Sequence, residues 1–271
     1  IHEAFYVARS GRPGPVLVDI TKDAQQSSGE FVWDPSPVRL PGYRPDLRAS
    51  DVEYQQAVEL INNAKRPIIF AGHGVMLSGA TDLVRELAER ANIPIAMTLL
   101  GIGSFPALHP LNLGMMGMHG EAWVNQAIQE ADLLLAFGMR FDDRVTGKLE
   151  SFAPGAKIIH ADIDPAEISK NRRADVPIVG DCKEVLADLV EAVRADRAEH
   201  GEPDLSSWWK QVGGLRDLGA GPQRAGADQD RDLLAGVQDL GRLLQRGPGR
   251  RGGHGGGGAG GDQLAGAVGN G

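Results

Sequence analysis

Cysteine and long apolar runs are scarce in this sequence, and each scarcity excludes a class of protein. The one cysteine, Cys182, excludes a disulfide framework and a cysteine-rich metal site. No apolar run approaches the roughly 20 residues of a membrane span, and no signal peptide is visible. The formal net charge of −8 disfavours a general nucleic-acid binder. The sequence therefore predicts a soluble, cytoplasmic protein without membrane or nucleic-acid partners.

Lysine, glutamate and aromatic residues are absent from residues 213–271, although this tail holds 20 of the 37 glycines. So abrupt a change in composition indicates an aberrant Gly/Arg-rich tail, as when GC-rich DNA is read out of frame, and its glycines predict disorder. An RGG-like segment that binds single-stranded nucleic acid is the alternative, but such segments are strongly basic. The seven Arg and six Asp of this tail nearly cancel.

The beginning of the chain resembles the end of a domain. Apolar residues at helical spacing start at Ile1, a Gly/Pro turn follows, and residues 16–20 have the pattern of a strand. A helix and a strand cannot make a domain alone. We therefore expect residues 1–24 to end a preceding domain, and residues 25–49, which are rich in Pro, Ser and Gly, to form a linker.

Strands and helices alternate from residue 50 to residue 200. Ser50 and Glu53 form a capping-box pattern that begins a helix reaching about residue 64. Strands are expected at 67–71, 93–97, 133–137, 157–161 and 176–179, with helices at about 78–91, 121–130 and 181–200. Residues 98–120 are expected to form a long loop, and 201–212 the start of another linker. The alternation predicts an α/β fold with a doubly wound parallel sheet.

The clearest functional signal follows the third expected strand. Gly138 ends its apolar run, and four charges then occupy five residues: Arg140, Asp142, Asp143 and Arg144. Ligands bind at the carboxyl ends of parallel strands, and two guanidinium groups suit a phosphate. The alternative is a solvated loop whose charges pair with one another.

Other candidate residues fall at the same sheet edge. The glycine turn at residues 72–74 could turn backbone N–H groups toward a phosphate, or it could be a plain structural turn. A dinucleotide fingerprint would place a third glycine at Leu77 and an acidic residue at Thr98, so an ordinary NAD fold is disfavoured. Asp162 and Asp164 could accept hydrogen bonds from ribose hydroxyls or an adenine amine, or simply start a short helix.

A loop rich in methionine and glycine, residues 111–120, also has two interpretations. Its methionines could cover a flat apolar ligand ring, or they could fill gaps in a mobile loop. His119 has no second His or Cys at ligand spacing, so the sequence predicts no metal site.

Five motifs together resemble one family. In order they are GRPGPVLVDITKD, IIFAGHGV, GMMGMHG, FGMRFDDRVTG and HADIDPAEI. They resemble, up to about residue 211, the catalytic large subunit of acetolactate synthase (acetohydroxyacid synthase), a thiamine-diphosphate enzyme. The resemblance implies a Rossmann-like central domain at residues 50–200 that binds FAD in an extended pose. It implies that the flavin does no net redox in the main reaction.

The resemblance also assigns residues. Those implied to line FAD are Arg12, Gly72, His73, Gly74, Thr98, Leu99, Gly117, Met118, His119, Gly138, Arg140, Asp142, Arg144, Val145, Asp162, Ile163 and Asp181. Those implied to lie near the substrate channel are Lys22, Met118, Asp143 and Arg144. No catalytic residue is assigned to this chain. The thiamine-diphosphate and Mg²⁺ sites would lie mainly in domains outside it.

The implied reaction is the decarboxylation of pyruvate on thiamine diphosphate and carboligation to pyruvate or 2-oxobutyrate, in branched-chain amino-acid biosynthesis. The resemblance implies a transferase that is a homodimer or homotetramer, with a small regulatory subunit as a further partner. We expect the chain alone to be inactive. A related flavin enzyme such as pyruvate oxidase, or a non-catalytic nucleotide-binding module, remains the alternative.

Overall fold

The computed structural model describes residues 1–34, 36–45 and 48–219. The predicted aberrant tail therefore lies, from residue 220 onward, outside the described residues. Helices α1 (His2–Arg9) and α2 (Lys22–Gln26) contain no buried residue. The strand expected at residues 16–20 is wrong for the described structure: no described strand pairs with it, and Leu17 is 92% exposed. An extended segment becomes a strand only when a neighbour satisfies its backbone groups.

Six strands form the parallel sheet at the centre of the described structure. Their bounds are β1 Pro67–Ala71, β2 Ile95–Met97, β3 Asn112–Met115, β4 Leu133–Phe137, β5 Lys157–Asp162 and β6 Val176–Val179. The order across the sheet is β3-β2-β1-β4-β5-β6, so the winding reverses between β1 and β4. A crevice opens at the carboxyl ends of the strands where such a reversal occurs. The predicted α/β class is confirmed.

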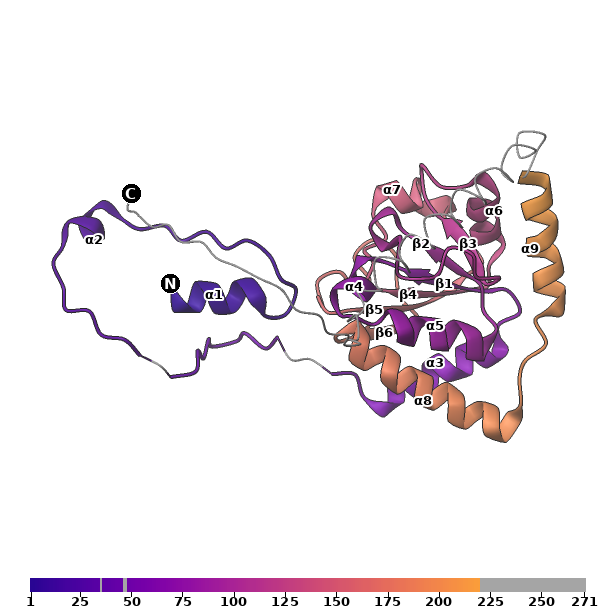
Figure 1. Cartoon of the computed structure of the whole chain (residues 1–271), viewed down its shortest axis with the longest axis horizontal. Helices are drawn as coiled ribbons and strands as arrows, with labels where there is room; N and C mark the ends of the chain where they lie inside the picture. The colour runs from indigo at the N-terminus through magenta and orange to yellow at the C-terminus, as the bar shows by residue number, and fades with distance from the viewer. Residues whose placement is uncertain (35, 46–47, 220–271) are drawn as a thin grey trace, which may run out of the picture. The chain divides into compact units, whose positions relative to one another are not determined.

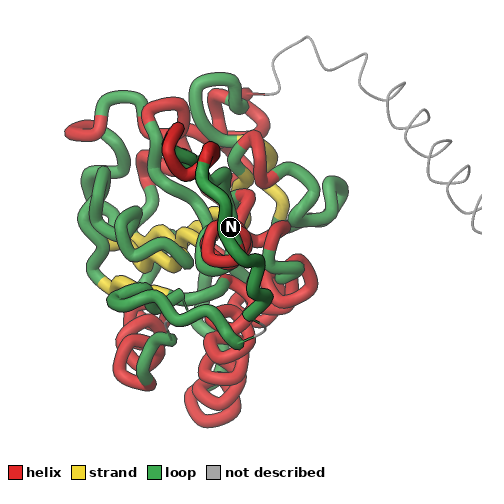
Figure 2. The backbone as a smooth tube through the Cα atoms, turned by 90° about the vertical axis from the view of Figure 1, so that its left-hand side faces the viewer, coloured by secondary structure: helices red, strands yellow, loops and turns green. Residues whose placement is uncertain are grey.

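Helices cover both faces of this sheet (Figure 1). They are α3 Asp51–Asn63, α4 His73–Leu77, α5 Thr81–Ala91, α6 Ala122–Glu130, α7 Asp143–Thr146, α8 Cys182–His200 and α9 Ser206–Gly219, with 3-10 turns at Leu99–Gly101 and Leu149–Ser151. On one face α3 and α5 pack against α8, and α6 packs against α9. The view turned by 90° shows the yellow strands between red helices (Figure 2).

Each face of the sheet has its own apolar core. Along β1, Ile69 and Ala71 belong to the core beneath α3, α5 and α8, whereas Ile68 and Phe70 belong to the core beneath α6 and α9. All five residues of β1 and of β4 are buried. These strands have continuous apolar runs because both faces of the sheet are buried. Burial of each large apolar side chain stabilises the fold by about 1.5–3 kcal/mol.

The sequence pattern predicts the start of α3 correctly but misses short elements elsewhere. The capping box of Ser50 and Glu53 is present. Strand β3 and helix α4 were not expected, because each is only a few residues long and contains glycine. β3 pairs with β2 through an irregular register beside Ile95.

The domain also continues beyond residue 200, where a linker was expected. Trp208, Val212 and Leu215 of α9 are buried in the second core, and the Arg216 guanidinium lies 5.0 Å from the ring centroid of Trp123 on α6. Residues 213–219, which the sequence assigned to the aberrant tail, are therefore the last turns of a packed helix. The apolar spacing of residues 208, 212 and 215 was the signal for it.

At the opposite edge of the sheet, Asp132 joins three strands. Its carboxylate accepts hydrogen bonds from the backbone N–H groups of Lys65 and Arg66, each at 2.8 Å. Its own N–H donates to the Arg66 carbonyl, and its carbonyl accepts from the N–H of Lys157. One residue thus connects the amino ends of β1, β4 and β5.

Candidate functional site

A cleft of about 1,040 Å³ lies at the carboxyl edge of the sheet. Its walls come from the segments that follow all six strands, β1 to β6, together with a turn near the start of the chain. Reversal of the winding between β1 and β4 leaves room at this place. The volume is just above the roughly 300–1,000 Å³ typical of ligand pockets.

The cleft brings together 15 of the 17 residues expected to line a flavin. They are Arg12, His73, Gly74, Thr98, Leu99, Met118, His119, Gly138, Arg140, Asp142, Arg144, Val145, Asp162, Ile163 and Asp181. Gly72 and Gly117 are not on its wall. Of the expected channel residues, Met118 and Arg144 line the cleft, whereas Lys22 begins α2 and Asp143 begins α7.

The glycine turn after β1 has a packing role in this structure. The N–H of Gly72 donates to the Phe137 carbonyl, and that of Gly74 to the Gly138 carbonyl. A Cβ at Gly72 would lie 2.2 Å from the Gly138 oxygen, and one at Gly74 would lie 2.6 Å from the Gly138 Cα. These two N–H groups are therefore occupied by protein, and the glycines allow the turn to touch the loop after β4.

Two guanidinium groups of that loop reach the cleft. Arg140 is half exposed, and its Nη2 lies 3.1 Å from Oδ2 of Asp142. Arg144 forms no ion pair with a described residue, and its Nη1 lies 3.6 Å from the Met118 sulfur. Arg140 is paired only in part and Arg144 is in no ion pair among the described residues, so both keep hydrogen-bond donors available to an anion.

Asp142 contributes an acceptor without a partner. It is the N-cap residue of α7, but its side chain makes no capping bond. Its Oδ1 is buried and has no hydrogen-bond partner among the described residues. Such an atom is costly unless a donor reaches it, and a sugar or polyol hydroxyl is a donor of the right kind.

Arg12 is held by carboxylates at the end of β5. Its Nη1 lies 2.9 Å from Glu167 and 3.2 Å from Asp164. Burial alone would raise the pKa of Glu167, but hydrogen bonds from Arg12 and Lys170 bring that pKa below its usual value. Arg12 therefore lines the cleft with part of its guanidinium already neutralised.

Burial shifts the pKa values of two further groups at the cleft. Burial raises the pKa of Asp162, opposed by a hydrogen bond from the Asp164 N–H and by the charge of Arg12. Burial raises the pKa of the Cys182 thiol to about 12, so this thiol stays protonated and unreactive near neutral pH. Asp181, the N-cap of α8, accepts the N–H of Lys183.

The residue chemistry of the cleft fits an extended dinucleotide. Its wall carries four arginines (Arg9, Arg12, Arg140 and Arg144) against three aspartates (Asp142, Asp162 and Asp181). Arginine suits a diphosphate, carboxylates suit ribose hydroxyls, and the methionines at 115, 116, 118 and 139 offer apolar cover for a ring.

The expected flavin-lining residues omit ten residues of the wall. They are Arg9, Gly11, Pro13, Leu77, Ser78, Leu100, Met115, Met116, Met139 and Cys182. Met115 and Met116 nevertheless belong to the loop whose methionines were expected as possible cover for a ligand ring. Most of the ten are direct sequence neighbours of expected residues, and that adjacency was the available signal.

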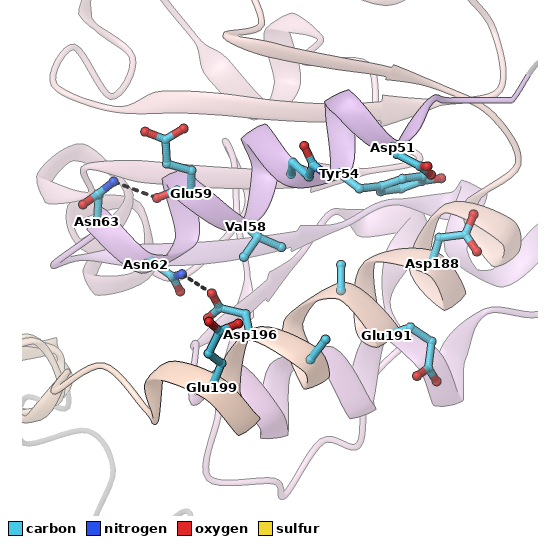
Figure 3. Close-up of a pocket in the computed structure, with 13 residues that line it drawn as sticks. Asp51, Tyr54, Val58, Glu59, Asn62, Asn63, Asp188, Glu191, Asp196 and Glu199 are labelled. Carbon is cyan, nitrogen blue, oxygen red and sulfur yellow. Dashed lines mark hydrogen bonds between the residues drawn. The ribbon is translucent and has the colours of Figure 1, made fainter.

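A second cavity differs in chemistry (Figure 3). It measures about 930 Å³ and lies between α3 and α8. Six carboxylates line it: Asp51, Glu59, Asp188, Glu191, Asp196 and Glu199. No Lys or Arg is among its lining residues, so it would repel an anionic dinucleotide. Among the described residues we find neither a group of three or more His, Cys, Asp or Glu arranged to hold a metal ion nor a helix that could span a bilayer.

Comparison with known proteins places this architecture in a family. Residues 54–189 match the model of the thiamine pyrophosphate enzyme central domain. The chain is 50% identical to an acetolactate synthase large subunit of Mycobacterium tuberculosis over 228 residues, which cover 83% of this chain and 37% of that protein. It is 50% identical to the Corynebacterium glutamicum large subunit over 233 residues (86% and 36%). It is 48% identical to a probable large subunit of Methanocaldococcus jannaschii over 217 residues (79% and 36%).

The chain thus spans little more than a third of the length of these relatives. The family match covers α3 to the middle of α8 and contains every strand of the described sheet. The chain therefore belongs to the thiamine pyrophosphate enzyme family, in which it supplies a central domain, and over most of its length it is similar to acetolactate synthase large subunits.

Proposed function

We propose that this chain provides the FAD-binding part of an acetolactate synthase large subunit. The observation that carries the proposal is the cleft at the reversal of the sheet, where Arg140, Arg144 and the unpaired Asp142 Oδ1 meet. The choice of enzyme rests on the similar proteins, which are named acetolactate synthase large subunits. The whole protein would decarboxylate pyruvate on thiamine diphosphate with Mg²⁺, and join the product to a second 2-oxoacid.

Each group of the cleft has a part in holding the cofactor. Arg140 and Arg144 bind the diphosphate, Asp162 accepts hydrogen bonds on the adenosine side, and Asp142 accepts one from the sugar or polyol chain. Met118 and its neighbours cover the flavin ring. The flavin, when bound, supplies a flat aromatic surface and does no net redox in the main reaction. The residues of this chain act by binding, orienting and excluding water.

Flavin titration of the full 271-residue chain tests the proposal. Replacing Arg140 or Arg144 with alanine removes charge-assisted hydrogen bonds worth about 1.5–3 kcal/mol, so the Kd for FAD should rise about 10- to 150-fold. Arg85→Ala is the matched control, because Arg85 lies on the surface of α5 and Glu89 is its one ion-pair partner among the described residues. Equal affinities in all four proteins would exclude the assignment.

Redox behaviour separates this proposal from a pyruvate-oxidase role. In an intact homologue, pyruvate should leave the bound flavin oxidised if the enzyme is an acetolactate synthase. Bleaching of the visible flavin band by pyruvate under anaerobic conditions would favour the oxidase. The purified chain itself should make no acetolactate from pyruvate when supplied with thiamine diphosphate, Mg²⁺ and FAD. Turnover above a control without protein would contradict that expectation.

A further inference from the structure

Asn125 of α6 binds both backbone groups of a single residue in the loop after β3. Its Oδ1 accepts the N–H of Gly117 at 2.9 Å, and its Nδ2 donates to the Gly117 carbonyl at 2.8 Å. The orientation of the amide is fixed by chemistry, because an N–H can only donate and a carbonyl can only accept. Gly117 is therefore held at two points by one side chain.

Gly117 also lies directly against the loop that carries the arginines. Its φ is +96°, and a Cβ there would lie 2.6 Å from the Arg144 carbonyl oxygen. The next residue, Met118, donates its N–H to that same carbonyl at 2.8 Å. A continuous path, made of hydrogen bonds and the peptide bond between Gly117 and Met118, thus runs from Asn125 to Arg144.

One end of this path lines the cleft and the other end does not. Asn125 and Gly117 are away from the cleft wall, whereas Met118, His119 and Arg144 are on it. The Arg144 side chain returns to the Met118 sulfur at 3.6 Å, so backbone and side chain connect the same two residues. A shift of Gly117 would therefore move the ring-covering methionine and the phosphate-binding arginine together.

We propose that Asn125 is a positioning residue for the flavin site, and that it sets the placement of Met118 and Arg144 through Gly117. The inference rests on the proposed function, because it takes the ligand to be FAD. Removal of its side chain would leave the Gly117 N–H without that partner, whereas the Gly117 carbonyl would keep its hydrogen bond from the N–H of Gly120. A loss of about tenfold in FAD affinity corresponds to the net value of one to two neutral hydrogen bonds.

The test compares Asn125→Ala, Asn125→Asp, Arg144→Ala and the double variant Asn125→Ala/Arg144→Ala with the unaltered chain by FAD titration. Asn125→Asp keeps the shape but replaces the donor with an oxygen that faces the Gly117 carbonyl, so it should weaken binding at least as much as alanine. Asn63→Ala is the matched control, because Asn63 is an exposed helical asparagine whose side chain, within the described part of the chain, bonds the Glu59 carbonyl alone. It should bind FAD as the unaltered chain does.

Two readouts separate positioning from a general loosening of the loop. If Asn125 acts through Arg144, its replacement should cost less than about threefold once Arg144 is alanine, since contacting residues are not additive. The visible circular dichroism of the bound flavin at saturation should change in Asn125→Ala and not in Asn63→Ala. Fully additive losses, or an unchanged flavin spectrum, would overturn the inference.

Failure of the inference can be told apart from failure of the proposed function. If Arg140→Ala weakens FAD binding but Asn125→Ala does not, the flavin site stands and the positioning role is wrong. If the unaltered chain binds no FAD, amide hydrogen exchange decides the link without a ligand. Protection of the Gly117 and Met118 amides should then fall in Asn125→Ala and persist in Asn63→Ala. Unchanged protection would refute it.

Discussion

Trp208 offers the sharpest test of how far the domain extends. Its side chain is 1% exposed, it lies in the core beneath α6, and its Nε1–H donates to the Pro67 carbonyl at the start of β1. Truncation of a buried tryptophan to alanine costs about 3–5 kcal/mol, because apolar burial is lost and a cavity remains. Trp208→Phe keeps a smaller aromatic ring and loses the hydrogen bond, so it should cost less than Trp208→Ala but more than the roughly 1 kcal/mol of a hydrogen bond alone.

Trp209 is the matched control for this change. It is the next residue, it also donates its Nε1–H to a backbone carbonyl, that of Asn92, and it is only partly buried. Urea unfolding followed by circular dichroism measures the stability of both alanine variants. With an m value of about 2–3 kcal/mol/M, Trp208→Ala should lower the midpoint by about 1–2.5 M. Trp209→Ala should lower it far less.

The reasoning fails if the two alanine variants shift the midpoint equally, or if Trp208→Ala shifts it by less than its neighbour. Either result would mean that α9 does not pack on the sheet in solution, and that residues after 200 are a linker, as their position in the sequence had indicated. A change in m rather than in midpoint would instead point to loss of cooperative unfolding.

Three other changes have clear expected outcomes. Gly74→Ala should cost about 1–3 kcal/mol or more in urea unfolding, because the new Cβ would lie 2.6 Å from Gly138 Cα, whereas Gly155→Ala, with open space around it, should cost little. Burial lowers the pKa of His160, so the unfolded state binds the proton more strongly than the folded state does. The free energy of unfolding should therefore fall as pH drops below about 6.5. The difference in that free energy between the unaltered chain and His160→Gln should become smaller in the same pH range. A gap independent of pH would contradict this. Burial raises the pKa of Asp162, because it disfavours the charged carboxylate, and an asparagine at this position can still accept the Asp164 N–H. Asp162→Asn should therefore raise the melting temperature, by about 2–4 °C for each kcal/mol gained, and should weaken FAD binding. A lower melting temperature would contradict this reasoning.

The larger elements could be predicted because their signals are local. The continuous apolar runs of β1 and β4 and the capping box before α3 need no tertiary information. Strand β3 could not be found in this way. Its four residues include Gly114 and Asn112, and it is a strand only because β2 lies beside it.

The site divides in the same manner. The charges after β4 stand out in the sequence, and the sheet topology explains why they line a cleft. The exact role of the glycine turn could not be read, because whether its N–H groups face a ligand or the loop at Gly138 depends on how two distant segments meet. Asn125 gave no signal at all: a single polar residue in a helix is ordinary until its partner is known.

Asp132 has a consequence for the accuracy of the cleft at the other end of the sheet. By joining the amino ends of β1, β4 and β5, it favours the alignment in which Pro67 lies opposite Leu133 and Leu133 opposite Lys157. A slip of one residue would displace a strand end by about 3.3 Å and turn every side chain to the other face. Gly72 and Gly138, five residues further along their strands, would then no longer meet. The hydrogen bonds of Asp132 at one edge of the sheet therefore help to set the positions of the residues that line the cleft at the opposite edge.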